Sequence, residues 1–139
     1  DGFLSIIDNY GGTPAGNSAK YYAGISYLNV GQFQAAIDYL EDFSGAGEIL
    51  PIMKYGAMGD AYAELGNFDS ALSNYNKAVG AGDIDALVAH YLKKVGMLNE
   101  KQGNFAAAKD AYTRIKNNYP TSPEGSDIEK YIMRVEAKS

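Results

Sequence analysis

The sequence contains no cysteine, and among its 139 residues there is a single histidine, His90. The absence of cysteine excludes a disulfide framework, a cysteine nucleophile and a thiolate zinc site. One histidine also cannot form a motif of paired histidine ligands. We therefore expect the chain to hold neither a metal nor a cofactor, and its fold must rest on hydrophobic packing alone.

The sequence also lacks any run of about 18 apolar residues, the length needed to cross a bilayer. Its formal charge is −5, whereas a nucleic-acid-binding domain normally presents a basic face. We therefore expect no membrane insertion by this segment and no nucleic-acid partner. The chain opens at Asp1 rather than at methionine, so we expect a processed or trimmed chain, which is compatible with a membrane anchor upstream.

Three segments of the chain repeat one pattern, namely AGISYLNVGQFQAAIDYL (23–40), MGDAYAELGNFDSALSNY (58–75) and VGMLNEKQGNFAAAKDAY (95–112). Each has a glycine near its start, a second glycine seven residues later, and then an aromatic residue, an alanine and a large apolar residue at fixed spacing. In chain order these positions are Gly24, Gly31, Phe33, Ala36 and Leu40; Gly59, Gly66, Phe68, Ala71 and Tyr75; and Gly96, Gly103, Phe105, Ala108 and Tyr112. Such self-similarity indicates a repeat architecture.

The spacing within each segment predicts a helical hairpin. After the second glycine, apolar residues such as Phe68, Ala71 and Tyr75 recur at three- and four-residue steps, which places them on one helix face. The second glycine can end the first helix in the left-handed conformation, and the residue that follows it, Asn67 or Asn104, can cap the second helix. The first glycine should let the two helices approach closely, and we expect the alanine to fill that gap.

Both ends of the chain carry partial repeats. Residues 3–16 match residues 112–125 at a constant offset, so the chain should open with the second helix of a repeat whose first helix is missing. Ser122 and Pro123 predict the start of a final helix that covers the last repeat. The predicted units are a truncated repeat at 1–13, full repeats at 14–47, 48–83 and 84–121, and a capping helix at 122–139. The predicted fold class is all-α: a right-handed α-α superhelix of helical hairpins, with eight helices and no strand.

This pattern resembles the tetratricopeptide repeat, whose unit has about 34 residues. The resemblance covers nearly the whole chain in three copies, and it departs from the family's pattern at two points. The aromatic residue of the first helix, Tyr27 or Tyr62, is Asn99 in the third copy, and the closing proline appears only as Pro120. The resemblance implies a superhelix whose concave surface, lined by the first helices, binds peptides or other proteins.

No residues in the sequence form a recognisable catalytic motif. His90 has no serine or aspartate at a spacing typical of a triad. Asp83 and Asp85 flank a loop where they can cap a helix, and Glu41 and Asp42 are neighbours that point in different directions on a helix. We therefore expect that the chain is not an enzyme.

Helical periodicity places further side chains beside the buried stripe of each first helix, on the surface where the resemblance implies binding. This predicted groove is apolar at its start and charged toward its end. It consists of Tyr21, Ile25 and Leu28 in the first full repeat, Met53, Asp60 and Glu64 in the second, and His90, Lys93, Met97 and Lys101 in the third.

A narrower resemblance is to tetratricopeptide repeat proteins of the bacterial cell envelope. It rests on the segments FLSIIDNYGGTPAG (3–16) and YTRIKNNYPTSPEG (112–125), which are similar to that group's junctions between helices. Its members include a membrane-tethered periplasmic subunit associated with the protein translocon and the periplasmic factor of the Tol–Pal system. The resemblance implies a non-enzymatic scaffold in the periplasm, tethered to the inner membrane, that assists protein transport or envelope assembly. The alternatives are a cytoplasmic adaptor in complex assembly or signalling, and an interaction module cut from a larger enzyme.

The expected partner is a protein or peptide. Some members of the family grip the C-terminal carboxylate of a chaperone with lysines and asparagines, but the matching positions here carry Tyr21, Ile25 and Ala57, so that clamp is absent. The uncovered stripe of the truncated repeat, which includes Phe3 and Ile6, predicts a homodimer through the N-terminal end.

Overall fold

The computed structural model describes residues 2–139, and Asp1 lies outside the described residues. Over that range the chain forms eight α-helices and no strand, which confirms the predicted all-α fold class. The helices are α1 (Gly2–Tyr10), α2 (Pro14–Asn29), α3 (Phe33–Asp42), α4 (Leu50–Glu64), α5 (Phe68–Gly80), α6 (Asp85–Lys101), α7 (Phe105–Asn118) and α8 (Ile128–Lys138), with a short 3-10 helix at Gly125–Asp127.

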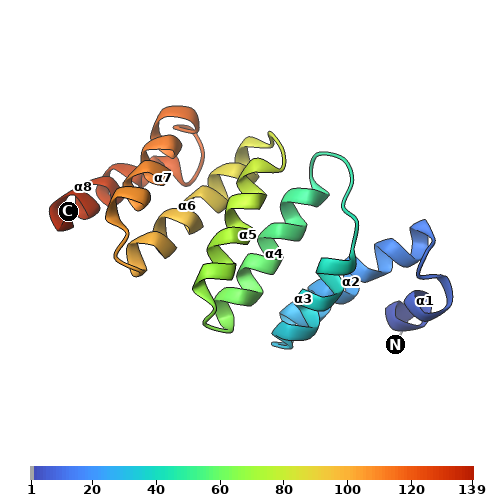
Figure 1. Ribbon diagram of the computed structural model, residues 1–139. Coiled ribbons are helices and arrows are strands. Elements are labelled where there is room, and N and C mark those ends of the chain that lie inside the picture. Colours follow the sequence, from blue (N-terminus) through green and yellow to red (C-terminus); the bar gives the residue numbers. More distant parts are fainter. Residues whose placement is uncertain (1) are drawn as a thin grey trace.

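The helices stack in a single row, with the two chain ends at opposite ends of the molecule (Figure 1). Each helix packs mainly on its neighbours in sequence, so α2 pairs with α3, α4 with α5 and α6 with α7. Lesser contacts join first helices across repeats, from α2 to α4 and from α4 to α6. Such neighbour-to-neighbour packing is the defining property of a repeat array.

The turn inside each hairpin depends on a glycine in the left-handed region. Gly31, Gly66 and Gly103 have φ angles of 80°, 78° and 80°, a region that costs a glycine little and other residues much more. These glycines were expected to end the first helices, and they do so.

Side-chain caps begin some of the helices. The Thr13 hydroxyl accepts a hydrogen bond from the Gly16 amide at 3.1 Å, and the Asn67 side chain accepts one from the Ser70 amide at 3.3 Å. Asn104 was expected to act like Asn67 but makes no side-chain cap hydrogen bond. The cap therefore contributes to α2 and α5 and not to α7.

The first glycine of each hairpin does bring two helices close together. A Cβ atom built on Gly24, Gly59 or Gly96 would come within 2.6, 2.5 or 2.3 Å of its nearest neighbour. Those neighbours are the large side chains of Leu40, Tyr75 and Tyr112, not the alanines that we expected to fill the gap. The large apolar residue seven positions after the aromatic one is thus the true partner of the glycine.

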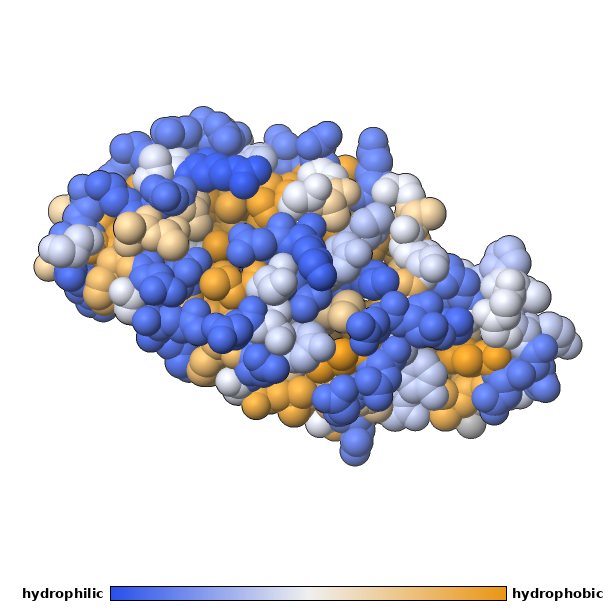
Figure 2. All heavy atoms as spheres, in the orientation of Figure 1, coloured by the Kyte–Doolittle hydropathy of each residue, from blue (hydrophilic) through white to orange (hydrophobic). Residues whose placement is uncertain are grey.

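The buried residues form two clusters. The larger runs from Ile52 on α4 to Val135 on α8, and the smaller joins Ile37 and Leu40 of α3 to Ala57, Met58 and Ala61 of α4. On the surface seen in Figure 2, hydrophobic residues appear as separate patches among hydrophilic ones. The half-buried Tyr55 and Tyr62 pack against both clusters, so apolar contacts run along the array, as expected for stacked hairpins.

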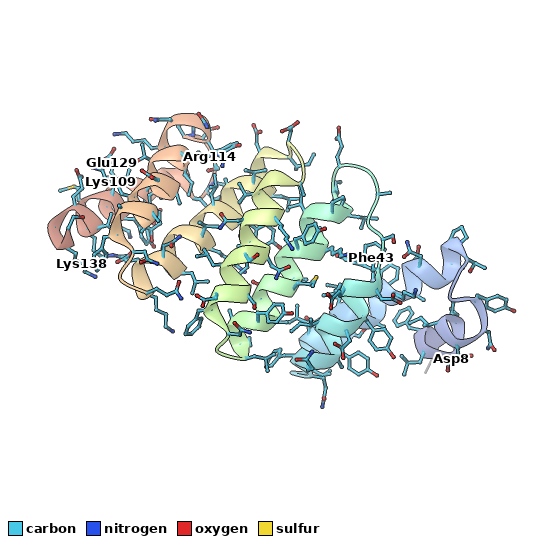
Figure 3. All side chains as sticks on the ribbon, in the orientation of Figure 1. Asp8, Phe43, Lys109, Arg114, Glu129 and Lys138 are labelled. Carbon is cyan, nitrogen blue, oxygen red and sulfur yellow. The ribbon has the colours of Figure 1, made fainter. Side chains whose placement is uncertain are left out.

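Lys54 of α4 binds the end of α3. Its ammonium group donates hydrogen bonds to the carbonyl oxygens of Phe43 at 2.6 Å and Glu41 at 3.3 Å. A cation at a helix C-terminus interacts favourably with the unpaired carbonyl groups there. Phe43 is itself buried, with its ring 5.2 Å from that of Tyr21 (Figure 3).

The final helix starts later than predicted, at Ile128 instead of Ser122. The Ser122 hydroxyl accepts a hydrogen bond from the Gly125 amide at 3.0 Å, but this closes a turn and not an α-helix. The Ser126 hydroxyl then donates to the Pro123 carbonyl at 2.8 Å. Local side-chain hydrogen bonds of this kind compete with the main-chain ladder, which explains the delayed start.

Candidate protein-binding groove

Three adjoining hollows follow the first helices along the array. Their volumes are about 550 Å³ where α2, α4 and α6 approach one another, about 550 Å³ between α4 and α6, and about 400 Å³ between α6 and α8. Neighbouring hollows share lining residues, which are Ala63, Glu64, Tyr75 and Lys94 for the first two and Met97 and Lys101 for the last two. We call this continuous track the α2–α8 groove.

The chemical character of the α2–α8 groove changes along its length. Leu28 and Phe33 line its N-terminal end. Phe68 and Met97 line the middle, where Met97 is 47% exposed and so available for contact. The C-terminal end carries three cations and one carboxylate, namely Lys101, Arg134, Lys138 and Glu100.

A cluster of three polar side chains forms the floor of the middle section. The Asp60 carboxylate accepts a hydrogen bond from the Tyr75 hydroxyl at 2.7 Å and from the Lys94 ammonium group at 2.6 Å. Burial, and then the hydrogen bond to Asp60, raises the pKa of Tyr75 well above its usual value. The phenol is therefore a neutral hydrogen-bond donor at any physiological pH.

Lys94 also lies close to two aromatic rings. Its nitrogen is 5.7 Å from the ring centre of Tyr75 and 5.6 Å from that of Tyr91. Burial, with a smaller contribution from the charge of Asp60, raises the pKa of Tyr91 to about 12. Lys94 is thus held by an ion pair and two ring faces, which fixes a long side chain that would otherwise be mobile.

A second cluster forms the floor of the C-terminal section. The Glu100 carboxylate accepts hydrogen bonds from Arg134 at 2.6 and 2.7 Å, and from the Tyr112 hydroxyl at 2.9 Å. Lys138, at the C-terminal end of α8 (Figure 3), lies 3.4 Å from the same carboxylate. The hydrogen bonds from Arg134 hold the pKa of Glu100 below its usual value, against the opposing effect of burial. Charge-assisted hydrogen bonds are stronger than neutral ones, and a bidentate pair also fixes the relative orientation of its two side chains.

The two clusters have the same construction. Each has a carboxylate on a first helix and a tyrosine from the second helix of that repeat. The cation lies on the next helix, which is α6 for the first cluster and the capping helix α8 for the second. In both cases the carboxylate and the cation are 34 residues apart in sequence. The clusters therefore bind α4 to α6 and α6 to α8 along the floor of the groove.

The structure brings five of the ten predicted groove residues into the α2–α8 groove. They are Leu28, Asp60, Glu64, Met97 and Lys101. Tyr21 and Ile25 instead pack, half-buried, against the smaller core cluster. Met53 is half-buried on α4 and is not among the lining residues of the three hollows.

His90 and Lys93 lie on the side of α6 that faces the segment leading into α8. The ring of His90 packs edge-on against Tyr91, and its Nδ1 is 3.9 Å from the Glu124 carboxylate. Burial, and then the charge of Lys94, lowers the pKa of His90 despite that carboxylate. Lys93 lies 4.6 Å from the ring centre of Tyr131. Both residues thus belong to the junction between α6 and α8.

Sequence reasoning missed several residues of the groove, among them the polar residues Tyr75, Lys94, Glu100, Arg134 and Lys138. Tyr75 shows the helical periodicity of a core residue, and its ring is indeed buried while its hydroxyl reaches the groove. Lys94 resembles any solvated lysine in sequence. The one available signal was the repeated interval between a carboxylate on one first helix and a cation on the next.

Within residues 2–139, no group of three or more histidine, cysteine, aspartate or glutamate side chains is placed to hold a metal ion. None of the helices in that range is both long enough and apolar enough to span a bilayer.

Comparison with known proteins supports the repeat architecture. Residues 57–123 match the family model of the tetratricopeptide repeat. This segment contains Asp60 and Lys94, the part of α4 from Ala57 onward, α5 and the third hairpin, so the match covers the middle of the α2–α8 groove. A comparison with curated proteins gives no match.

The fold is similar to that of PcrH, a protein whose crystal structure was solved in complex with the chaperone binding region of PopB. The superposition has a TM-score of 0.65 and covers 91% of this chain and 97% of that chain, with 14% sequence identity. The similarity is one of fold, and it covers more of the array than the segment 57–123.

Proposed function

We propose that this chain is a non-enzymatic scaffold that binds a segment of a partner protein in the α2–α8 groove. The observation that carries the proposal is the continuity of the groove, because neighbouring hollows share lining residues from α4 to α6. A bound segment would therefore contact several repeats at once. The tetratricopeptide match and the PcrH complex support a peptide or protein as the ligand.

The lining predicts the order of residues in the bound segment. The N-terminal and middle sections of the groove offer apolar contacts at Leu28, Phe33 and Met97. The C-terminal section has two more positive than negative charges. A segment with apolar anchors followed by acidic side chains would complement this order, with the anchors supplying most of the binding energy.

Two methionines provide a matched test. Met97 is 47% exposed in the groove, whereas Met133 on α8 is 66% exposed and does not line it. Peptides selected from a random display library against the wild-type chain should be measured by fluorescence anisotropy against both variants. Met97→Glu should weaken binding by at least about tenfold, and Met133→Glu should leave it unchanged. Equal effects of the two substitutions would contradict the groove assignment.

We also propose that the scaffold works in the bacterial envelope, in the periplasm and tethered to the inner membrane, where it assists protein transport or envelope assembly. The support is the similarity of segments 3–16 and 112–125 to helix junctions of envelope proteins. Protease treatment of spheroplasts of the source organism tests this location. Digestion of the full-length protein without lysis is expected, and protection until lysis would favour the cytoplasmic adaptor instead.

A further inference from the structure

A second, separate groove lies at the N-terminal end of the array. It has a volume of about 550 Å³ and is lined by α1 and α2, through Gly2, Phe3, Ile6, Ala23, Ser26, Tyr27 and Val30. We call it the α1–α2 groove. α1 has no buried residue, and hydrophobic surface is visible where α1 and α2 lie, at the right-hand end of Figure 2. The groove is separate from the α2–α8 groove, with which it shares no lining residue.

The internal repeat shows that this surface is covered everywhere else in the array. Phe3 is 39% exposed, but the equivalent residues of the three full repeats are 0%, 5% and 0% exposed; these are Leu40, Tyr75 and Tyr112. Ile6 is 36% exposed, but its equivalents are 3%, 0% and 0% exposed; these are Phe43, Ala78 and Ile115. The α1–α2 groove is therefore the fourth copy of a site that is filled three times.

The occupant of the three filled sites is the first helix of the repeat. These helices, α2, α4 and α6, have 16, 15 and 17 residues. Each places a glycine, Gly24, Gly59 or Gly96, where a side chain would collide with the residue equivalent to Phe3. In the α1–α2 groove, Phe3 and Ile6 present to solvent the apolar surface that a first helix covers in each full repeat.

We propose that the α1–α2 groove binds one amphipathic helix of a partner, about four turns long, which lies against both α1 and α2. The partner helix carries glycine opposite Phe3 and apolar residues on either side of it. Among the lining side chains, only Ser26 and Tyr27 carry polar atoms. A helix satisfies its own backbone hydrogen bonds, whereas an extended peptide in this groove would leave backbone groups unpaired.

A second copy of the chain fits this groove less well. A two-fold symmetric contact would place groove against groove, and the residues of α1 that face the groove include Phe3 and Ile6, which are larger than the glycine of a first helix. The helix proposal also requires a small residue at one defined position, which gives it a test that general hydrophobic association would fail.

The test adds a first helix of known sequence to the full chain. A copy of residues 49–72 placed directly before Asp1 puts the copied Gly59 at the same sequence distance from Phe3 as Gly59 is from Tyr75. We expect the melting temperature to rise by at least about 4 °C. We also expect amide hydrogen exchange in α1 to slow by at least about tenfold, because an uncovered terminal helix exchanges by local opening.

The matched control is the same extended chain with Gly59→Leu in the copied segment only. The leucine should remove the gain in melting temperature and the protection of α1. If both extended chains gain equally, or if neither does, the proposal is wrong. Analytical ultracentrifugation of the unmodified chain tests the remaining alternative, a dimer of two copies. A dimer that Phe3→Glu dissociates would identify a second copy as the occupant and would overturn the helix assignment.

Discussion

Gly59 and the ring of Tyr75 are so close that a Cβ atom at position 59 would lie 2.5 Å from two ring carbons. The hydroxyl of that same ring is held by Asp60, at 2.7 Å. The ring therefore cannot withdraw from position 59 without losing a hydrogen bond on the groove floor. One contact thus joins the packing of a hairpin to the polarity of the surface where we propose that a partner binds.

Gly59→Ala should lower the free energy of unfolding by about 1–3 kcal/mol, as overpacked cores do. Gly80→Ala is the control, because nothing lies within 4 Å of a Cβ atom built there. That substitution should be neutral or stabilise by a few tenths of a kcal/mol, since it lowers the entropy of the unfolded chain. Urea denaturation measures both, and equal values for the two variants would contradict the close contact.

The Asp60–Lys94 pair should show measurable coupling. Its side chains are 31% and 32% exposed, so we expect a double-mutant cycle with Asp60→Asn and Lys94→Met to give about 0.5–1 kcal/mol. The Lys109–Glu136 pair, whose side chains are 46% and 50% exposed, serves as the comparison and should show a smaller coupling energy. A larger coupling for the more exposed pair would show that the Tyr75 and Tyr91 rings do not help to hold Lys94.

Glu100 should make the stability of the array depend on pH. Its pKa is lowered in the folded chain, chiefly by the hydrogen bonds from Arg134. The folded state therefore binds this proton less readily than the unfolded state does. The resulting stabilisation is fully present above the unfolded value of 4.5 and is lost as the pH falls through the lower, folded pKa.

The measurement for Glu100 is urea denaturation of the wild type and Glu100→Gln from about pH 7 to about pH 3. The difference in unfolding free energy between the two chains should shrink as the pH falls. Glu136→Gln, whose carboxylate is half-exposed, is the control and should differ little from wild type throughout. A constant difference for Glu100→Gln would mean that its ionisation does not contribute to stability.

The two asparagines after the hairpin glycines should differ in importance. Asn67 caps α5 through its side chain, whereas Asn104 makes no such hydrogen bond to α7. Asn67→Ala should therefore cost about 1 kcal/mol of unfolding free energy, and Asn104→Ala clearly less. Thermal denaturation of the two variants measures these losses. A larger loss for Asn104→Ala than for Asn67→Ala would show that α7 relies on its cap in solution.

Periodic features of the sequence predicted the fold because they act locally. Left-handed glycines such as Gly66 are required by the turn itself, so their recurrence predicted each hairpin without any tertiary information. The start of α8 was mispredicted for a related reason. The serine and proline at 122–123 are typical of a helix start, but Ser126 takes the Pro123 carbonyl and closes a different turn.

The groove was only half predictable, because its polar floor depends on side chains from three helices. Helical periodicity identifies which side chains lie beside the buried stripe of a first helix, and it placed Asp60 and Met97 in the groove in this way. It cannot show that a buried tyrosine has its hydroxyl in the groove, as Tyr75 does. Nor can it show how far one first helix turns relative to the next, which decides whether Lys94 reaches Asp60.

The two polar clusters also make the stiffness of the array uneven. Asp60 and Lys94 bind α4 to α6, and Glu100 and Arg134 bind α6 to α8. Among the described residues no ion pair joins α2 to α4; the two helices meet at the smaller hydrophobic cluster, and Lys54 of α4 holds the end of α3 instead. Apolar contacts have no preferred direction, whereas charged hydrogen bonds fix an angle. Bending should therefore concentrate between α2 and α4, so that the apolar mouth of the α2–α8 groove adjusts its width while its cationic end keeps its shape.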